Sequence, residues 1–140
     1  MDSGIERQLR KIRKKGRTTE ADLHRFEQEY RRETARRFGK IVLTENWMLR
    51  ESGMAACVLP LKEIVWVYHM PKISKRFGDY YDIHLCFRNG ARFLLDCYPG
   101  ALSPIMKLLA ERCPNAQFDE YSWKRKREWK EEAKQWRTFQ

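Results

Sequence analysis

The chain opens with apolar residues at helical spacing. The first apolar stripe predicts a helix over residues 4–15, and its members lie four and three positions apart: Ile5, Leu9 and Ile12. Thr18 or Thr19 then caps a second helix that runs to Gly39, with a buried stripe made of Leu23, Phe26, Tyr30 and Phe38. The stripe is too short for a coiled-coil seam, so we expect the helices to dock on the domain or on a second subunit.

From residue 40 the apolar pattern changes from helical to extended. β-branched or alternating runs, each bounded by a turn or a proline, predict strands at 40–44, 47–51, 54–59 and 63–70. Pro60 closes the third of these strands and Pro71 closes the fourth. In the fourth strand, alternation places three apolar side chains on one face: Ile64, Trp66 and Tyr68. The polar segment 71–79 predicts a loop.

An Asn-Gly pair between two apolar runs marks a β-hairpin with strands at 80–88 and 91–98. A three-residue loop over 88–90, with Gly90 in the left-handed region, would pair Leu85 with Phe93 and Ile83 with Leu95. This register collects the apolar groups on one face, whereas a two-residue turn would pair Phe87 with Arg92 and mix them. We predict the three-residue loop, which leaves Cys86 opposite Arg92 on the outer face.

Helical patterns return after the hairpin. Ser103 caps a helix over 103–113 with Pro104 at its first position, and an extended piece over 116–121 follows. Ser122 caps a last helix over 123–138, which starts at Trp123 and has an apolar stripe made of Trp129, Ala133 and Trp136.

The length and composition set bounds on this arrangement. The chain has 140 residues, too few for a barrel enzyme or a two-domain dehydrogenase, and 42% apolar residues, enough for one core. No apolar run is long enough to span a bilayer and no secretory signal is visible, so we expect a soluble, cytoplasmic protein.

The net charge of +10 lies mostly at the two ends. Residues 1–39 carry +5, residues 40–121 carry +1 and residues 122–140 carry +4. The basic ends are either solvated helix faces or a surface for nucleic acid, anionic lipid or an acidic partner. The residues that would form such a surface are Arg10, Lys11, Arg13, Lys14, Lys15, Arg17, Lys124, Arg125, Lys126 and Arg127.

Residues able to do chemistry are present but form no recognised motif. The four cysteines, Cys57, Cys86, Cys97 and Cys113, have no metal-binding spacing and are expected to be reduced thiols. On one strand, Asp82, His84 and Cys86 share a face and could in principle activate a thiolate, with Cys86 the thiol to watch. A solvated strand face shows the same alternation, so we predict no catalytic residue, no metal and no cofactor.

The order of elements resembles a known fold family. The phrases LTENWMLRESG, VLPLKEIVWVYHM, YYDIHLCFRNGARFLLD and LLAERCPNA are similar to bacterial pleckstrin-homology-like (PH-like) proteins of unknown function. The resemblance implies an α+β fold: an antiparallel β-meander or barrel of about six to seven strands closed by a C-terminal helix. Residues 40–121 would form this domain, with a basic helical extension at 1–39 and a basic, Trp-rich helix at 122–140.

Two functions remain open at this point. The resemblance favours a non-enzymatic module that binds a protein or peptide partner, with homodimers as one form of it. The alternative is a nucleic-acid-binding protein whose two basic ends meet in one surface and whose binding weakens steeply with salt. Contact of the first helix with anionic lipid is a third interpretation, although three apolar anchors would insert weakly.

Overall fold

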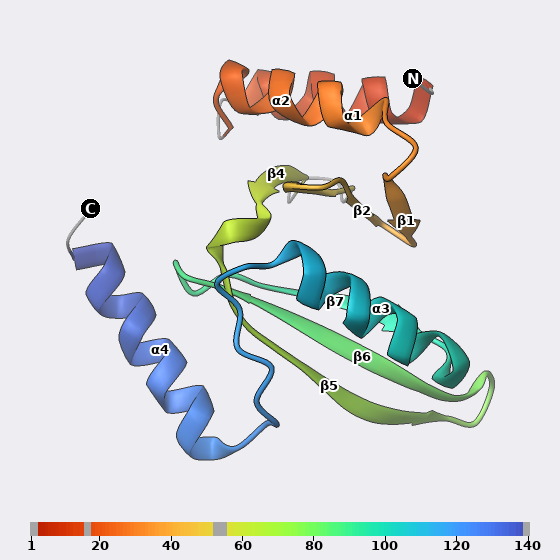
Figure 1. Cartoon of the computed structure of the whole chain (residues 1–140), viewed down its shortest axis with the longest axis vertical. Coiled ribbons are helices and arrows are strands. Elements are labelled where there is room, and N and C mark those ends of the chain that lie inside the picture. The colour runs from red at the N-terminus through yellow and green to blue at the C-terminus, as the bar shows by residue number, and fades with distance from the viewer. Residues whose placement is uncertain (1–2, 16–17, 52–55, 139–140) are drawn as a thin grey trace. The chain divides into compact units, whose positions relative to one another are not determined.

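The computed structural model describes residues 3–15, 18–51 and 56–138 as a mixed α+β chain (Figure 1). It divides into two compact units, Met1–Leu61 and Lys62–Gln140, and each is described by itself. Each unit contains one antiparallel sheet, and neither sheet closes into a barrel within the described residues. Three expectations lie outside the described residues: the turn at 52–53, the start of the strand predicted at 54–59, and the end of the first helix at Gly16.

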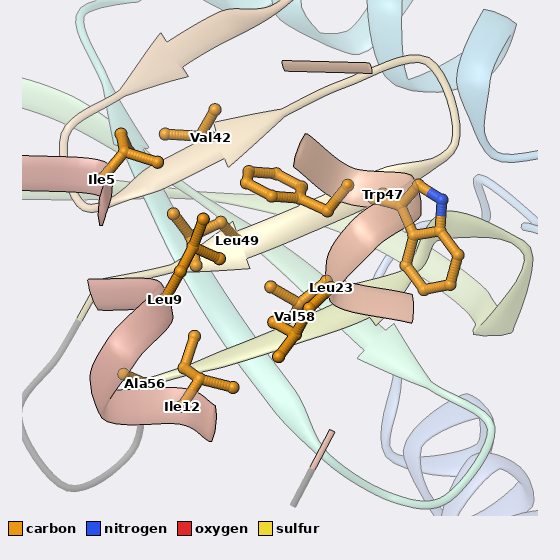
Figure 2. Close-up of a cluster of buried hydrophobic side chains, with 10 residues drawn as sticks. Ile5, Leu9, Ile12, Leu23, Val42, Trp47, Leu49, Ala56 and Val58 are labelled. Carbon is orange, nitrogen blue, oxygen red and sulfur yellow. The ribbon is translucent and has the colours of Figure 1, made fainter. Parts of the chain in front are cut away.

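The first unit packs two helices on a four-stranded meander with the order β1-β2-β3-β4. Its elements are α1 (Ser3–Lys15), α2 (Glu20–Tyr30), β1 (Arg36–Phe38), β2 (Ile41–Leu43), β3 (Trp47–Arg50) and β4 (Cys57–Pro60). Figure 2 shows the core in which side chains of both helices meet those of the strands. The three apolar residues of α1 are at most 1% exposed, so this stripe is buried in the core of the first unit. These side chains are therefore not available to insert into a lipid surface, as the interpretation of α1 as a lipid-contacting helix requires.

The second helix is shorter than predicted. Thr19 caps it as expected, since its side chain accepts the Asp22 N–H, but it ends at Tyr30 rather than at Gly39. The segment that was expected to continue it forms β1, and Phe38 pairs with Ile41 across a turn in which Gly39 has φ +59°. Phe38 has the spacing of a helical stripe, yet ladder formation with β2 overrides that local pattern.

A buried carboxylate connects α2 to the turn between β2 and β3. Glu29 is 9% exposed, and its oxygens accept hydrogen bonds from Thr44 Oγ1 at 2.8 Å and from Asn46 N and Nδ2 at 2.8 and 2.7 Å. Thr44 Oγ1 in turn accepts the Trp47 N–H at 3.0 Å. The three donors satisfy the buried oxygens of Glu29, so this side chain fixes the last turn of α2 against the sheet.

The second unit is a three-stranded meander followed by two helices. A 3₁₀ turn at Leu61–Glu63 leads into β5 (Ile64–Ser74), β6 (Gly78–Phe87), β7 (Arg92–Cys97), α3 (Pro99–Arg112) and α4 (Trp123–Thr138). The sheet order is β5-β6-β7, and α3 runs along it (Figure 1). The extended piece predicted at 116–121 pairs through Gln117 with Trp66 at the outer edge of β5. The far ends of this sheet are the β5–β6 turn and the β6–β7 turn.

Pro71 does not close the fourth predicted strand, and the loop predicted at 71–79 is a hairpin. β5 continues to Ser74, and Pro71 pairs with Tyr81. Proline is tolerated because β5 is an edge strand, where a missing N–H need not break a ladder. A register shift between Ile64 and Trp66 also separates their side chains, because their partners Phe87 and Cys86 are neighbours on β6 and point to opposite faces. Only Trp66 and Tyr68 share the predicted face.

The β6–β7 hairpin has the predicted register. Leu85 pairs with Phe93 and Ile83 with Leu95, and the loop contains the three residues 88–90. Gly90 has φ +94°, the left-handed conformation that this loop requires. Cys86 pairs with Arg92 as predicted, but its face is covered: Cys86 is fully buried and belongs to a cluster with Trp66, Tyr68 and Trp129.

The two C-terminal helices match the pattern to different degrees. α3 begins at Pro99, four residues before the predicted cap Ser103, so Pro104 lies inside the helix. Pro99 is itself suited to a first helical position, which explains the earlier start. α4 has the predicted bounds, with Ser122 Oγ accepting the Arg125 N–H at 3.0 Å. Trp129 and Ala133 are buried as expected, whereas Trp123 is 72% exposed.

Replacing Glu29 by Ala should destabilise the first unit by about 2–3 kcal/mol, because three donors lose their acceptor in a buried site. Urea unfolding measured by circular dichroism gives this difference in the free energy of unfolding. Glu33→Ala, at an exposed position beyond α2, is the control and should stay within about 0.5 kcal/mol of wild type. Equal effects of the two variants would contradict a structural role for the Glu29 carboxylate.

Candidate functional site

A cleft of about 510 Å³ opens between α4 and the β6–β7 turn. We call it the basic cleft, and its lining residues are Gly90, Arg92, Lys126, Trp129, Lys130, Ala133 and Arg137. Four of the seven are cationic, and they come from two elements that are distant in the sequence. None of the four forms an ion pair with a carboxylate among residues 3–15, 18–51 and 56–138. Their positive charge is therefore available to a ligand.

Helical periodicity explains why α4 presents these cations together. Lys126, Lys130 and Arg137 are four and seven positions apart, so they lie along one stripe of the helix. The acidic residues of α4 occur at other phases of the helix: Glu128, Glu131 and Glu132. The cationic stripe lies next to the buried residues Trp129 and Ala133, so docking of those two residues brings the stripe to the sheet.

Contacts between the turn and the helix fix the cleft. Trp129 Nε1 donates a hydrogen bond to the carbonyl of Phe87 at 2.9 Å, and Arg137 Nη1 donates one to the carbonyl of Asn89 at 2.8 Å. A Cβ on Gly90 would lie 2.8 Å from Arg137 Nη1 and 3.3 Å from the Ala133 Cβ. Glycine at position 90 therefore serves the left-handed turn and also allows the close approach of α4.

The predicted cluster at 124–127 does not act as one patch. Lys126 lines the basic cleft, and its Nζ lies 5.7 Å from the ring centroid of Trp123. Arg125 has a structural role instead. Its Cζ lies 4.9 Å from the ring centroid of Trp66, and its Nε lies 3.5 Å from Oδ2 of Asp119. Lys124 is exposed and lies 3.9 Å from Glu128, and Arg127 is exposed. Consecutive residues on a helix are about 100° apart, so four in a row point in four directions.

The predicted N-terminal cations belong to the first unit. Arg13 is held between two acids, with Nε 3.0 Å from Glu20 and Nη2 2.6 Å from Glu27. Arg10 lines a small hollow beside Arg13, and Lys11 and Lys14 are exposed. The side chain of Lys15 and the whole of Arg17 lie outside the described residues. A single surface formed by both basic ends stays a prediction.

The polar strand face next to the basic cleft is largely buried. Asp82 and His84 are each 8% exposed, and Cys86 is fully buried. The His84 ring stacks on Tyr68, with 4.3 Å between centroids, and neither ring nitrogen has a hydrogen-bond partner within the part of the chain that the structure describes. Burial, followed by the fields of Arg92, Lys72 and Lys126, lowers the pKa of His84 to about 4. His84 is therefore neutral at physiological pH.

Burial also disfavours the charged forms of the other two groups of this face. Burial raises the pKa of the Cys86 thiol to about 12, so the thiol that we marked as reactive is protonated and enclosed. Burial, together with a hydrogen bond to Asp96 and repulsion from it, raises the pKa of Asp82 to about 6. Asp82 and Asp96 are direct cross-strand partners, which brings the two carboxyl groups close together and explains the contribution of Asp96 to the raised pKa of Asp82.

Over residues 3–15, 18–51 and 56–138, no group of three or more His, Cys, Asp or Glu side chains is arranged to hold a metal ion. No helix in those same ranges has the length and apolar character needed to cross a membrane.

Sequence reasoning found Lys126 but missed Arg92, Lys130 and Arg137. Lys130 and Arg137 could have been found by placing the whole of residues 123–138 on a helical wheel rather than by looking for runs of like charge. Arg92 was visible in the hairpin register, but only the three-dimensional structure shows that α4 docks on that face.

Replacing Asp82 or His84 should change the pH dependence of stability in opposite directions. The raised pKa of Asp82 stabilises the fold below about pH 4 and loses this effect as pH rises through about 6. The lowered pKa of His84 stabilises the fold above about pH 6.5 and loses this effect as pH falls through about 4. When the pH is lowered from 7 to 4, the free energy of unfolding of Asp82→Asn should fall relative to that of wild type. The free energy of unfolding of His84→Phe should rise relative to wild type over the same range, and each difference should be on the order of 2 kcal/mol.

Urea midpoints measured from about pH 4 to about pH 7 test this prediction. Wild type contains both opposing effects, and each variant removes one of them. Asp79→Asn is the control, because it removes a carboxyl group from an exposed position on the same strand. Curves of Asp82→Asn and His84→Phe that run parallel to wild type would show that neither group titrates differently in the folded chain.

Comparison with known proteins gives one match. A family model described as Domain of unknown function (DUF6709) matches residues 4–116, from α1 to the segment after α3. No curated protein and no solved structure matches the chain. The match covers the whole of the β-sheet region and more than half of the chain, while α4 with its cationic stripe follows it. The chain belongs to the family Domain of unknown function (DUF6709).

Proposed function

We propose that the chain is a non-enzymatic interaction module of the PH-like kind, and that its basic cleft binds an acidic segment of a protein partner. The order of elements supports the PH-like assignment. A meander of four strands is followed by a meander of three strands and then by α3, as a strand meander closed by one C-terminal helix requires.

The convergence of four cations on one cleft, none of them in an ion pair within the described part of the chain, carries the proposal. Arg92 comes from the sheet, whereas Lys126, Lys130 and Arg137 come from α4. Holding like charges together is unfavourable in the free protein, and an anion that enters the cleft removes the repulsion. The apolar packing of Trp129 and the hydrogen bond of Arg137 to Asn89 hold the cations in place before the ligand arrives.

The shape and chemistry of the cleft suit a short acidic peptide. Arg92 and Arg137 provide planar forks that match carboxylates, and the two lysines add point charges. The buried residues Trp129 and Ala133 form the floor of the cleft beneath these cations. About 510 Å³ accommodates a few residues rather than a folded domain.

The state of the polar strand face supports a binding role rather than catalysis. A cysteine nucleophile needs a thiolate, and burial opposes ionisation of Cys86. His84 is neutral, but it lies stacked beneath Tyr68 in a buried site. These groups lack access to a substrate, and their arrangement is explained by packing.

Single-stranded nucleic acid is the second candidate ligand, and one observation favours it. Trp123 is 72% exposed, and Lys126 of the basic cleft lies beside its ring. An exposed indole next to a phosphate-binding cation is able to stack on a base. The two candidates differ in the part played by Trp123, because a carboxylate ligand has no need of it.

Binding of fluorescein-labelled octaglutamate, followed by fluorescence anisotropy, tests the proposal. Wild type should bind, and Lys126→Glu/Lys130→Glu should bind at least about tenfold more weakly, since two attractive charges become repulsive. Lys124→Glu/Arg127→Glu is the matched control, because it makes the same charge change on the same helix outside the cleft. It should bind within about twofold of wild type at about 0.15 M salt.

If the two charge-reversed variants lost affinity for octaglutamate equally, the loss would be due to net charge alone. That result would contradict a defined site. The same titrations with a fluorescein-labelled oligothymidylate separate the second candidate. Tighter binding of the oligonucleotide, lost in Trp123→Ala and steeply salt-dependent, would replace the peptide proposal with nucleic acid.

A further inference from the structure

The turn between β5 and β6 exposes apolar side chains at the end of the second sheet that lies away from the β6–β7 turn (Figure 1). Ile73 is 86% exposed and Phe77 is 75% exposed. Tyr98, which precedes α3, is also 75% exposed. Phe77, Tyr80 and Tyr98 line one shallow hollow of about 400 Å³, so they form a continuous surface. We call Ile73, Phe77, Tyr80 and Tyr98 the apolar tip.

The backbone of this turn is fixed rather than loose. Ser74 Oγ accepts hydrogen bonds from the N–H groups of Arg76 at 3.3 Å and Phe77 at 3.1 Å. Gly78 has φ +77°, which returns the chain into β6, and Ser74 pairs with Gly78 across the hairpin. The turn therefore presents Phe77 outward in a defined conformation, at the end of a continuous two-stranded ladder.

Cations surround the apolar tip. Lys75 and Arg76 lie in the turn and are exposed, and the Arg76 guanidinium carbon is 5.4 Å from the centroid of the Phe77 ring. Lys72 lies on β5 just before Ile73, with Nζ 4.0 Å from Asp82. The acidic groups near the tip are Asp79, opposite Ile73 in the ladder, and Asp96, which lines the hollow. The outermost positions thus combine apolar and cationic side chains.

We infer that the apolar tip inserts Ile73 and Phe77 into the interface of an anionic phospholipid bilayer, while Lys75 and Arg76 contact the headgroup phosphates. A bilayer gains from both components, because its interface accepts apolar side chains and its anionic headgroups attract cations. The two tyrosines fit the same surface, since an apolar ring with a polar hydroxyl is favoured at the level of the headgroups.

The contact proposed here differs from the one expected of α1. The apolar residues of α1 are buried in the first unit, whereas those of the apolar tip are exposed in the second. The tip also lies at the opposite end of β6 from the basic cleft. The ten residues of β6 separate the two sites by roughly 30 Å, so a bilayer at one end leaves the cleft open at the other.

Sedimentation of the full chain with vesicles tests the inference. Wild type should bind vesicles that contain one quarter phosphatidylglycerol in phosphatidylcholine, and should bind pure phosphatidylcholine vesicles at least about tenfold more weakly. Ile73→Ser/Phe77→Ser should lower the partition coefficient about tenfold or more at any salt concentration, because the inserted groups are removed. Lys75→Gln/Arg76→Gln should lower it mainly at low salt.

Two variants serve as controls. Trp123→Ser removes an aromatic side chain that is equally exposed but lies on α4, and it should bind vesicles as wild type does. Lys126→Glu/Lys130→Glu alters the basic cleft and should also leave vesicle binding unchanged, so this result is independent of the peptide proposal. All four variants change exposed or half-buried positions, and circular dichroism of each variant is the check that it folds.

Three results would overturn the inference. The first is wild-type binding by Ile73→Ser/Phe77→Ser, which would show that the apolar tip takes no part. The second is equal binding of wild type to both kinds of vesicle. The third is a dimer of wild type without vesicles that Ile73→Ser/Phe77→Ser converts to a monomer, which would make the tip a contact between two copies of the chain.

Discussion

The docking of Trp129 on the second sheet is the contact on which the candidate site depends. The indole is 4% exposed, packs in one cluster with Trp66, Tyr68 and Cys86, and donates its N–H to the carbonyl of Phe87. A single side chain thus combines apolar burial with the hydrogen bond that a buried indole N–H needs. Once it is in place, the phase of α4 is set, and with it the positions of Lys126, Lys130 and Arg137 above Arg92.

This contact also accounts for the buried polar groups of the same face. Asp82, His84 and Cys86 alternate along β6 as residues of a solvated strand do, yet α4 and the extended piece before it cover part of that face. Burial then disfavours the charged forms, and the pKa shifts of His84 and Cys86 follow. Two cations of the basic cleft add to this for His84, since a further positive charge beside Arg92 and Lys126 is unfavourable.

The sequence predicted most features that depend on neighbouring residues and few that depend on distant ones. The β6–β7 register, the caps at Thr19 and Ser122 and the stripe of α1 follow from local patterns, and all are present. The predicted extension of α2 to Gly39 and the loop at 71–79 fail because strand pairing decides those segments. The basic cleft could not be predicted for the same reason. A run of charges in the sequence shows neither which helix face docks nor what it docks on.

The lengths of the strands give the second unit its two separate ends. β6 is ten residues long and joins the β5–β6 turn to the β6–β7 turn, and one end borders a cationic cleft while the other exposes apolar side chains next to cations. Mixed apolar and cationic side chains on a protruding turn suit a fluid interface, which adapts to their shape. Fixed cations in a cleft suit a ligand whose charges can be matched one by one. The chemical difference between the two ends therefore favours two different ligands, and the length of β6 would keep the two proposed ligands apart.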